Sequence, residues 1–303
     1  MVPGNGTGYD DLATTLKEKM MFQRSAFLAA ALIFVLLVSA VPAEAQRDFE
    51  PLFDKFNFKL EGSWVGLTTD IRLDSELLGR GTTLSFEDDL NLDSGKTIPT
   101  LSFEWQIAKK HKLGVRWQDI NRDSTAQALT EIQWGDEIIP IDANISLGFD
   151  ITQAFIDYAY YPWVKDRWAA GFGLGLRWMD IQATLAYRGV GEEETIEGSS
   201  DVKGSAPLPY IYFEYRRLLS DNWRFITGLG WLYVKIDDIE GGQLIGRLRI
   251  EYLTDRRWGF GAAVNFANAG VDWAAIATEE ENILDARIDL DIWDFSVFVR
   301  VRF

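Results

Sequence analysis

The chain has 303 residues, no cysteine, one histidine, 12 tryptophans and a formal net charge of -16. The absence of cysteine excludes a disulfide framework and a thiolate metal site. The acidic balance argues against nucleic acid as a partner, because proteins bind nucleic acids mainly through basic surfaces.

The first 45 residues have the pattern of a targeting segment. Arg24 precedes an apolar run over 26–41, which is followed by the small residues Ala43 and Ala45. This pattern predicts a secretory signal peptide, a helix within 21–45 that is cleaved after Ala45. A retained membrane anchor is the alternative, but the apolar run is short for a membrane span.

The residues on either side of the signal peptide lack its pattern. Residues 1–20 are polar, and we interpret them as an extension upstream of the true start at Met20 or Met21. Residues 46–55 are expected to form a short periplasmic lead. The remaining chain, 56–303, contains no apolar run long enough for a membrane helix, so any membrane span within it must be made by strands.

From residue 56 onward, apolar residues recur at every second position. This period is typical of β-strands with one face in an apolar medium and the other in a polar one. The fourth strand changes the parity of its apolar residues, and we expect a β-bulge near Thr152. Eight or twelve strands are alternatives to ten, because 82–92 and 126–139 could be strand extensions, loop hairpins or an extra pair. The ten predicted strands cover about 56–72, 97–108, 113–118, 143–162, 167–186, 207–217, 223–236, 243–254, 257–270 and 293–303.

The last strand shows the alternation most clearly. Trp293 and Phe303 lie ten residues apart on one face, and Trp168 and Trp178 repeat this spacing in the fifth strand. At ~3.3 Å per residue and a tilt of about 40°, ten residues cover roughly 25 Å, the height of the apolar band of an outer-membrane barrel between its aromatic girdles. The apolar face of the last strand carries Trp293, Phe295, Val297, Val299, Val301 and Phe303.

A terminal phenylalanine that closes such a strand resembles the C-terminal signature of bacterial outer-membrane β-barrels. The resemblance covers 56–303 and implies an all-β fold, a transmembrane up-and-down antiparallel barrel in the outer membrane of a Gram-negative bacterium. It also implies that the barrel-assembly machinery recognises the last strand and that lipid and lipopolysaccharide surround a monomeric wall. The edge strand of a soluble sandwich is the alternative interpretation of this stretch.

The connections between the predicted strands alternate in length and charge. Short ones carry bases, such as Lys109 and Lys110, and long ones carry acids, such as Glu87–Asp89, Glu192–Glu194 and Glu279–Glu281. This alternation is typical of an up-and-down barrel with short periplasmic turns and longer outer loops. The acidic loops could collect divalent cations that bridge to lipopolysaccharide phosphates, or simply be solvated.

The inward positions of the strands predict a lumen lined by charge. Equal numbers of acids and bases there allow two interpretations. The leading one is a narrow porin-like channel for ions or small solutes, favouring cations at its acidic mouth. The alternative is a non-conducting structural or surface-interaction barrel with a salt-bridged closed core, resembling the transmembrane domain of outer-membrane protein A. The twelve predicted lumen residues are Glu61, Glu104, Arg116, Asp157, Arg177, Glu214, Arg247, Arg249, Glu251, Asp294, Arg300 and Arg302.

We expect neither an enzyme nor a cofactor or metal site. Enzymatic barrels resembling omptins, palmitoyl transferases, phospholipases or lipid A deacylases use a histidine near the rim or the outer leaflet. The single histidine, His111, lies in a lysine-rich turn that we place on the periplasmic side. The glycine-rich run 171–175 lies inside a strand without a following helix, which excludes a dinucleotide loop, and 89–95 matches a calcium loop poorly.

Overall fold

The computed structural model describes residues 52–303, except for 76–77, 135–136, 191–194, 237–238, 255–256 and 278–282. The predicted extension 1–20, the signal peptide 21–45 and its cleavage site at Ala43 and Ala45 lie outside these residues. Within the described part, no helix is long and apolar enough to cross a membrane.

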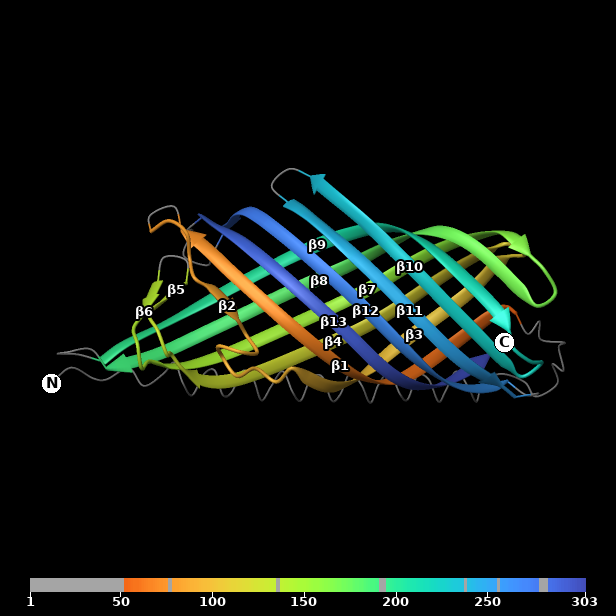
Figure 1. Ribbon diagram of the computed structural model, residues 1–303, viewed down its shortest axis with the longest axis horizontal. Coiled ribbons are helices and arrows are strands. Elements are labelled where there is room, and N and C mark those ends of the chain that lie inside the picture. The colour runs from red at the N-terminus through yellow and green to blue at the C-terminus, as the bar shows by residue number, and fades with distance from the viewer. Residues whose placement is uncertain are drawn as a thin grey trace. The chain divides into compact units, whose positions relative to one another are not determined.

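Ten long strands form one closed antiparallel ring (Figure 1). Each pairs with the next along the chain, and the last pairs with the first over nineteen residue pairs from Asn57↔Arg302 to Ser75↔Leu284. The predicted ten-stranded up-and-down barrel is therefore confirmed. The ring strands are β1 (Phe56–Ser75), β3 (Gly95–Ala108), β4 (His111–Gln127), β7 (Asn144–Val164), β8 (Trp168–Val190), β9 (Thr195–Leu218), β10 (Trp223–Ile236), β11 (Ile239–Leu253), β12 (Trp258–Ala277) and β13 (Ile283–Arg302).

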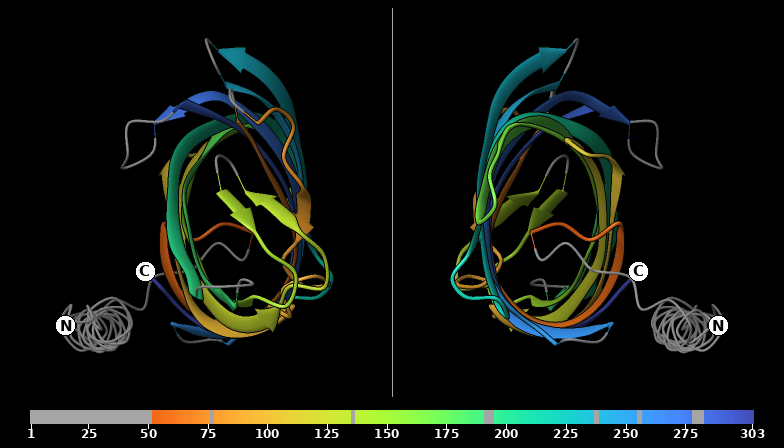
Figure 2. Two further views of the ribbon diagram at one scale, coloured as in Figure 1. Left: turned by 90° about the vertical axis from the view of Figure 1, so that its left-hand side faces the viewer. Right: turned by 90° about the vertical axis from the view of Figure 1, so that its right-hand side faces the viewer.

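Apart from the last two residues of β4, the described parts of the two stretches that left the strand number open contain only short strands outside the ring. β2 (Thr83–Ser85) pairs with part of β1. β5 (Ile132–Trp134) and β6 (Glu137–Ile139) form a hairpin of their own, which lies within the opening of the ring (Figure 2). These segments therefore cap one end of the barrel.

The two ends of the barrel differ. We call the end with the short β3–β4, β7–β8, β9–β10 and β11–β12 connections the turn end, and the opposite one the loop end. The longest strands are β8 and β9, with 23 and 24 residues. At ~3.3 Å per residue and a tilt of about 40°, they rise roughly 60 Å, about twice the thickness of a bilayer's hydrocarbon core. The barrel is thus much taller than a membrane is thick.

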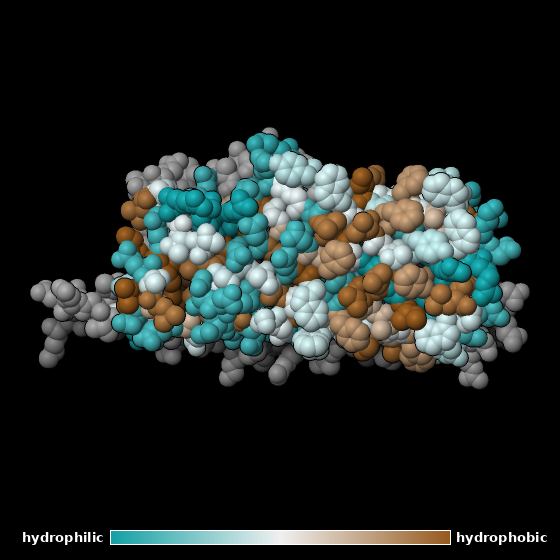
Figure 3. All heavy atoms as spheres, in the orientation of Figure 1, coloured by the Kyte–Doolittle hydropathy of each residue, from teal (hydrophilic) through white to brown (hydrophobic). Residues whose placement is uncertain are grey.

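The apolar side chains change faces halfway along the barrel. In the half next to the turn end (the turn half) they point outward, and polar or charged side chains point inward. In the half next to the loop end (the loop half) the order is reversed. Figure 3 shows the outer surface changing from apolar and aromatic at the right, over the turn half, to hydrophilic at the left. On β7, Ile145, Leu147, Phe149 and Ile151 are buried in the loop half, and Ile156 and Tyr158 are exposed in the turn half.

The bulge predicted near Thr152 is wrong. Thr152 pairs with Asp119 of β4 and with Asp180 of β8, and the register is unbroken on both sides. The inward row of β7 runs without interruption from the buried Phe149 to the buried Asp157. The parity of the apolar residues changes because the apolar side lies inside the barrel in the loop half and outside it in the turn half.

A belt of exposed apolar side chains surrounds the turn half. Trp178 and Trp293 lie at its upper edge, and the next outward positions on their strands are Asp180 and Asp291. This arrangement is the lipid-facing surface of a membrane barrel. The belt includes Val115, Trp117, Ile156, Tyr158, Phe172, Leu174, Ile211, Phe213, Leu229, Trp231, Leu248, Ile250, Phe260, Val264, Phe266, Phe295, Val297 and Val299.

An outward arginine substitution should destabilise the barrel in the turn half much more than in the loop half, because the belt of outward apolar side chains surrounds only the turn half. Leu174→Arg, in the belt on β8, should lower the free energy of unfolding by about 2–4 kcal/mol, because the charge would lie in hydrocarbon. Ala186→Arg, on the same outward face in the loop half, should change it by less than about 0.5 kcal/mol. Urea unfolding in lipid vesicles, followed by tryptophan fluorescence, measures both. Equal losses would contradict the belt's position.

Candidate functional site

The interior of the turn half contains a network of buried ion pairs, and Glu104 of β3 is one of its centres. The Glu104 carboxylate lies 2.8 Å from the ammonium of Lys59, 2.8 Å from the guanidinium of Arg249 and 3.2 Å from that of Arg216. These partners belong to β1, β11 and β9. A single carboxylate therefore connects strands from opposite parts of the ring.

Glu214 of β9 is a second centre. Its carboxylate lies 2.8 Å from the Lys112 ammonium and 2.7 Å from the Arg216 guanidinium, and it accepts a hydrogen bond from the Tyr161 hydroxyl. Arg216 contacts both Glu214 and Glu104, so the two centres form one network.

Glu251 of β11 is the third centre. Its side chain contacts the guanidinium groups of Arg224 at 2.5 Å, Arg300 at 2.6 Å and Arg249 at 3.6 Å. The residues Glu251, Arg224 and Arg300 are each 0% exposed. Removing ions from water in this way is costly unless each is paired and hydrogen bonded.

The segment before β1 closes the turn end of this network. Asp54 lies 3.0 Å from Arg224 and 3.7 Å from Arg302, and it also pairs with Arg300. The Leu52 carbonyl accepts a hydrogen bond from Arg224 at 3.1 Å. In the end-on views of Figure 2, this segment crosses the opening of the ring.

Asp54 precedes the first strand of the barrel and is held as a carboxylate. Burial alone would raise its pKa, but the guanidinium groups of Arg300 and Arg224 outweigh that effect and lower the pKa below its usual range. The charge that closes the turn end is therefore present at neutral pH.

A row of hydrogen bonds, mostly between uncharged side chains, marks the level at which the interior changes from polar to apolar. Ser63 and Thr100 are 2.9 Å apart, and Gln118 donates to the Thr100 hydroxyl at 3.0 Å. Gln153 donates to Gln118 at 2.8 Å, and the Arg177 Nε donates to Gln153 at 2.9 Å. This row crosses β1, β3, β4, β7 and β8.

Above this row, apolar side chains fill the interior. The cluster includes Phe149 of β7, Trp134 of the β5–β6 hairpin, and Phe86 and Leu90 of the segment after β2. Phe86 packs edge-on against Phe149 at 5.1 Å between ring centroids. Segments from both loops that left the strand number open thus pack inside the barrel.

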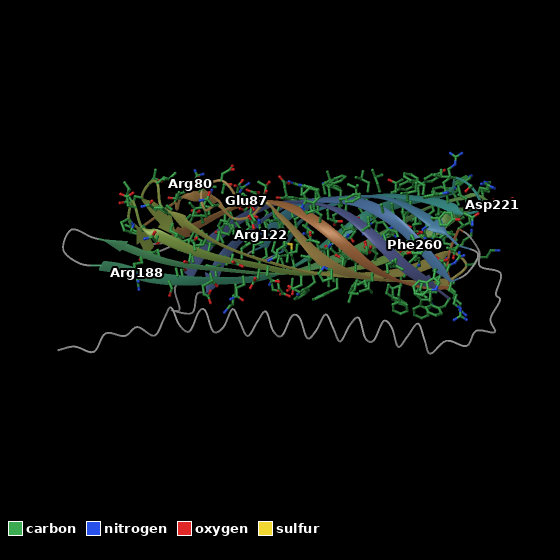
Figure 4. All side chains as sticks on the ribbon, turned by 90° about the horizontal axis from the view of Figure 1, so that it is seen from below. Arg80, Glu87, Arg122, Arg188, Asp221 and Phe260 are labelled. Carbon is green, nitrogen blue, oxygen red and sulfur yellow. The ribbon has the colours of Figure 1, made fainter. Side chains whose placement is uncertain are left out.

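One ion pair lies next to this apolar cluster. The Arg122 guanidinium is 2.5 Å from the Glu87 carboxylate and donates to the Thr69 hydroxyl at 2.8 Å. Figure 4 labels Glu87 and Arg122 side by side in the loop half. This pair joins the segment after β2 to the barrel wall.

All twelve predicted lumen residues lie inside the barrel, but the balance of charge differs from the prediction. The expectation counted six acids and six bases. The interior of the described turn half contains seven acids and ten bases, because the prediction had missed five buried ionic residues. Lys112 had been assigned to the lysine-rich turn. Arg216 lies on the inward face of the predicted strand 207–217 but was not counted among the lumen residues. The missed residues are Asp54, Lys59, Lys112, Arg216 and Arg224.

Arg116 and Arg177, which lie close to the row of hydrogen bonds, have fewer carboxylate partners than the arginines near the turn end. Arg116 and Arg177 both lie over the ring of Phe155, at 4.4 and 5.4 Å from its centroid. Arg116 also lies 3.6 Å from Asp294. The two terminal nitrogens of Arg177 have no hydrogen-bond partner among the described residues. Arg177 is therefore a buried cation without a carboxylate partner in that part of the chain.

The inward glycines of β8 and β12 allow close packing of the interior. A Cβ on Gly175 would lie 2.2 Å from the ring of Tyr210, and one on Gly261 would lie 2.4 Å from the ring of Phe298. These glycines therefore leave room for aromatic side chains from the neighbouring strands. They do not line an open wall of the lumen.

The last strand, β13, presents the outward apolar face that its alternating sequence predicted. Trp293, Phe295, Val297 and Val299 point outward from β13, and the Phe303 backbone exchanges hydrogen bonds with Phe56 at 3.1 and 2.8 Å. Recognition of this strand, including Val301 and Phe303, by the assembly machinery stays a prediction. His111 lies near the turn end, with its Nδ1 2.6 Å from the Tyr158 hydroxyl.

Comparison with known proteins supports the fold and not a function. No family model and no curated protein matches the sequence. The outer membrane protease OmpT from Escherichia coli is similar in structure, with a TM-score of 0.55 and 10% sequence identity over 86% of this chain and 99% of that one. At this identity the likeness concerns the fold alone.

Other solved outer-membrane proteins match with lower scores. OprG from Pseudomonas aeruginosa has a TM-score of 0.36 at 10% identity, covering 84% of this chain and 99% of that one. Ail of Yersinia pestis has a TM-score of 0.27 at 7% identity, covering 80% and 97%. The fold comparison therefore depends on OmpT. The closed ring, the exposed apolar belt and the likeness to OmpT together identify the chain as having the fold of a bacterial outer-membrane β-barrel protein.

Proposed function

We propose that the chain is a closed, non-conducting outer-membrane barrel whose loop half forms a rigid support outside the bilayer for surface interactions. The observation that carries this proposal is the double closure of the interior. Ion pairs fill the turn half around Glu104, Glu214 and Glu251, and a packed apolar cluster around Phe149 and Trp134 fills the loop half.

The narrow-channel interpretation receives less support from this geometry. Ions would have to cross the buried ion pairs and then a section packed mainly with apolar side chains, which offer few polar groups to replace their water. The excess of bases over acids in the turn half also argues against selection for cations there. A channel would therefore need both layers to part.

We further propose that the barrel is not an enzyme. The only histidine of the sequence, His111, lies near the turn end against Tyr158, far from the outer loops. OmpT is a protease, but the likeness to it is one of fold, which hosts many different functions.

Planar-bilayer recording of the refolded barrel tests the closure. We expect no discrete conductance steps over the accessible voltages, while a porin of known conductance, reconstituted in the same way, conducts. Heat-shifted gel mobility of the same sample checks that the barrel is folded. Reproducible steps from folded protein would overturn the proposal, and their reversal potential in a salt gradient would report the selectivity of the channel.

A further inference from the structure

A charged pocket of about 230 Å³ lies on the outer wall of the loop half, where β1 and β13 close the ring. Its strand residues alternate with the buried Ile71 and Ile288, so they belong to the outward face. Figure 4 labels Arg80 at the loop end of the barrel. The pocket is lined by Asp70, Arg72, Arg80, Thr83, Arg287 and Asp289.

The pocket brings like charges directly opposite one another. Asp70 of β1 pairs in register with Asp289 of β13, and the next outward positions pair Arg72 with Arg287. Like charges directly opposite on neighbouring strands destabilise a sheet. Two such pairs in one pocket, one negative and one positive, are therefore unfavourable unless other charges compensate for them.

Neighbouring side chains compensate for only part of this charge. The Arg72 Nε donates to Asp74 at 2.9 Å, and the Arg287 Nε donates to Asp289 at 2.9 Å. Arg287 also lies 3.8 Å from Asp272. Arg80 has no ion pair with another residue in the described part of the chain. The pocket therefore offers guanidinium groups to an anion and carboxylates to a cation.

The spacing of the two pairs suits a phosphate that carries its own cation. Successive outward positions of a strand are about 6.6 Å apart. Guanidinium groups bind phosphate oxygens through paired hydrogen bonds, and carboxylates bind Mg²⁺ and Ca²⁺. No group of three potential metal ligands occurs among the described residues, so the cation would need oxygens from the phosphate as well.

The height of the pocket indicates the source of that phosphate. Trp64 and Trp293 mark the upper edge of the belt on the same two strands, with ring centroids 5.5 Å apart. Arg72 follows Trp64 by eight positions and Arg287 precedes Trp293 by six, which corresponds to roughly 15–20 Å above the tryptophans at a tilt of about 40°. The headgroup layer of a phospholipid leaflet is only about 5–8 Å thick.

We propose that this pocket binds a phosphate on the core sugars of lipopolysaccharide, together with a divalent cation that bridges it to the barrel. Arg72, Arg287 and Arg80 contact the phosphate, and Asp70 and Asp289 contact the cation. This assignment does not depend on whether the barrel conducts. It places the cation on the barrel wall. The acidic runs that suggested a cation site in the sequence, Glu192–Glu194 and Glu279–Glu281, lie outside the described residues.

Binding of purified lipopolysaccharide to the refolded, detergent-solubilised barrel tests the site. We expect R72Q/R287Q to weaken the affinity about tenfold or more in magnesium, the loss expected for charge-assisted hydrogen bonds. D70N/D289N should remove the magnesium dependence, so that its affinity in magnesium equals that of the unsubstituted barrel in EDTA. The two variants therefore separate the anion and cation halves of the site.

The matched control removes a partly exposed acid and an exposed base from the loop half across the barrel. D201N/K203Q breaks an ion pair of 3.5 Å on β9 and should bind like the unsubstituted barrel. Heat-shifted gel mobility checks folding, and the single variant R80Q, outside the ring strands, tests the anion half if a double variant does not fold.

Two competing ligands distinguish the source of the phosphate. Lipopolysaccharide without core phosphates should bind the unsubstituted barrel as weakly as complete lipopolysaccharide binds R72Q/R287Q. Inorganic phosphate with magnesium should compete poorly. Affinity unchanged in both double variants would overturn the site, and competition by free phosphate as effective as by lipopolysaccharide would overturn the glycolipid assignment.

Discussion

Replacing Glu251 with glutamine should lower the free energy of unfolding by about 3–5 kcal/mol, the cost of removing one partner of a buried ion pair. Glu251 contacts Arg224, Arg300 and Arg249, and the substitution would leave these guanidinium groups to share Asp54 and Glu104. Urea unfolding of the barrel in lipid vesicles, followed by tryptophan fluorescence, measures the change.

Arg177→Met is the matched control for this prediction. It removes a buried charge that has no carboxylate partner among the described residues, so stability should be unchanged or higher. If the two variants lost similar amounts of stability, the interior would not be held by specific ion pairs. If both lost almost nothing, the charges would be solvated, and the channel interpretation would gain support.

Phe149→Ala should lower the free energy of unfolding by about 3–5 kcal/mol, because it removes a large side chain from a packed interior and leaves a cavity. The Phe149 ring is fully buried, contacts Phe86 edge-on at 5.1 Å and lies under the Arg122 guanidinium at 5.2 Å. The same unfolding measurement applies. Phe149→Leu should lose less, since it conserves more volume.

A neighbouring outward position provides the control for the apolar section. Ser146→Ala, on the same strand in the loop half, should change stability by less than about 0.5 kcal/mol. A loss below about 1 kcal/mol for Phe149→Ala would contradict a packed interior in the loop half. The barrel would then be open above the ion pairs.

The period of two was sufficient to predict the strands and their faces in the turn half. Residues that face lipid must be apolar and those that face the interior can be polar, so the residue types along each strand indicate which face is which. The outward row from Trp293 to Val299 and the inward Glu104, Glu214 and Glu251 were predicted on this basis.

The same reasoning failed where the outer surface is not in lipid and at the ends of strands. At Thr152 the change of parity was interpreted as a bulge, because a local pattern cannot distinguish an extra residue from an exchange of surroundings. Lys112 was assigned to a turn and Arg216 was left out of the predicted lumen, because residues at a strand end have too few neighbours to establish which face they belong to. Lys112 is buried because it pairs with Glu214, and Arg216 because it pairs with Glu104. Both partners lie on other strands, so a pattern within one strand does not reveal these pairs.

The sequence by itself determined the strand pattern, the lipid-facing belt and the identity of most inward charges, since each follows from alternation within one strand. The choice of ten ring strands over eight or twelve needed the tertiary structure. Only the tertiary structure decided whether those charges line water or neutralise one another. Glu104 and Arg249 are 145 residues apart, and Asp54 and Arg300 are 246 apart. Their contacts depend on how narrow the closed ring is and on which segments fold into it. The residue pattern of a single strand predicts neither the width of the ring nor those segments.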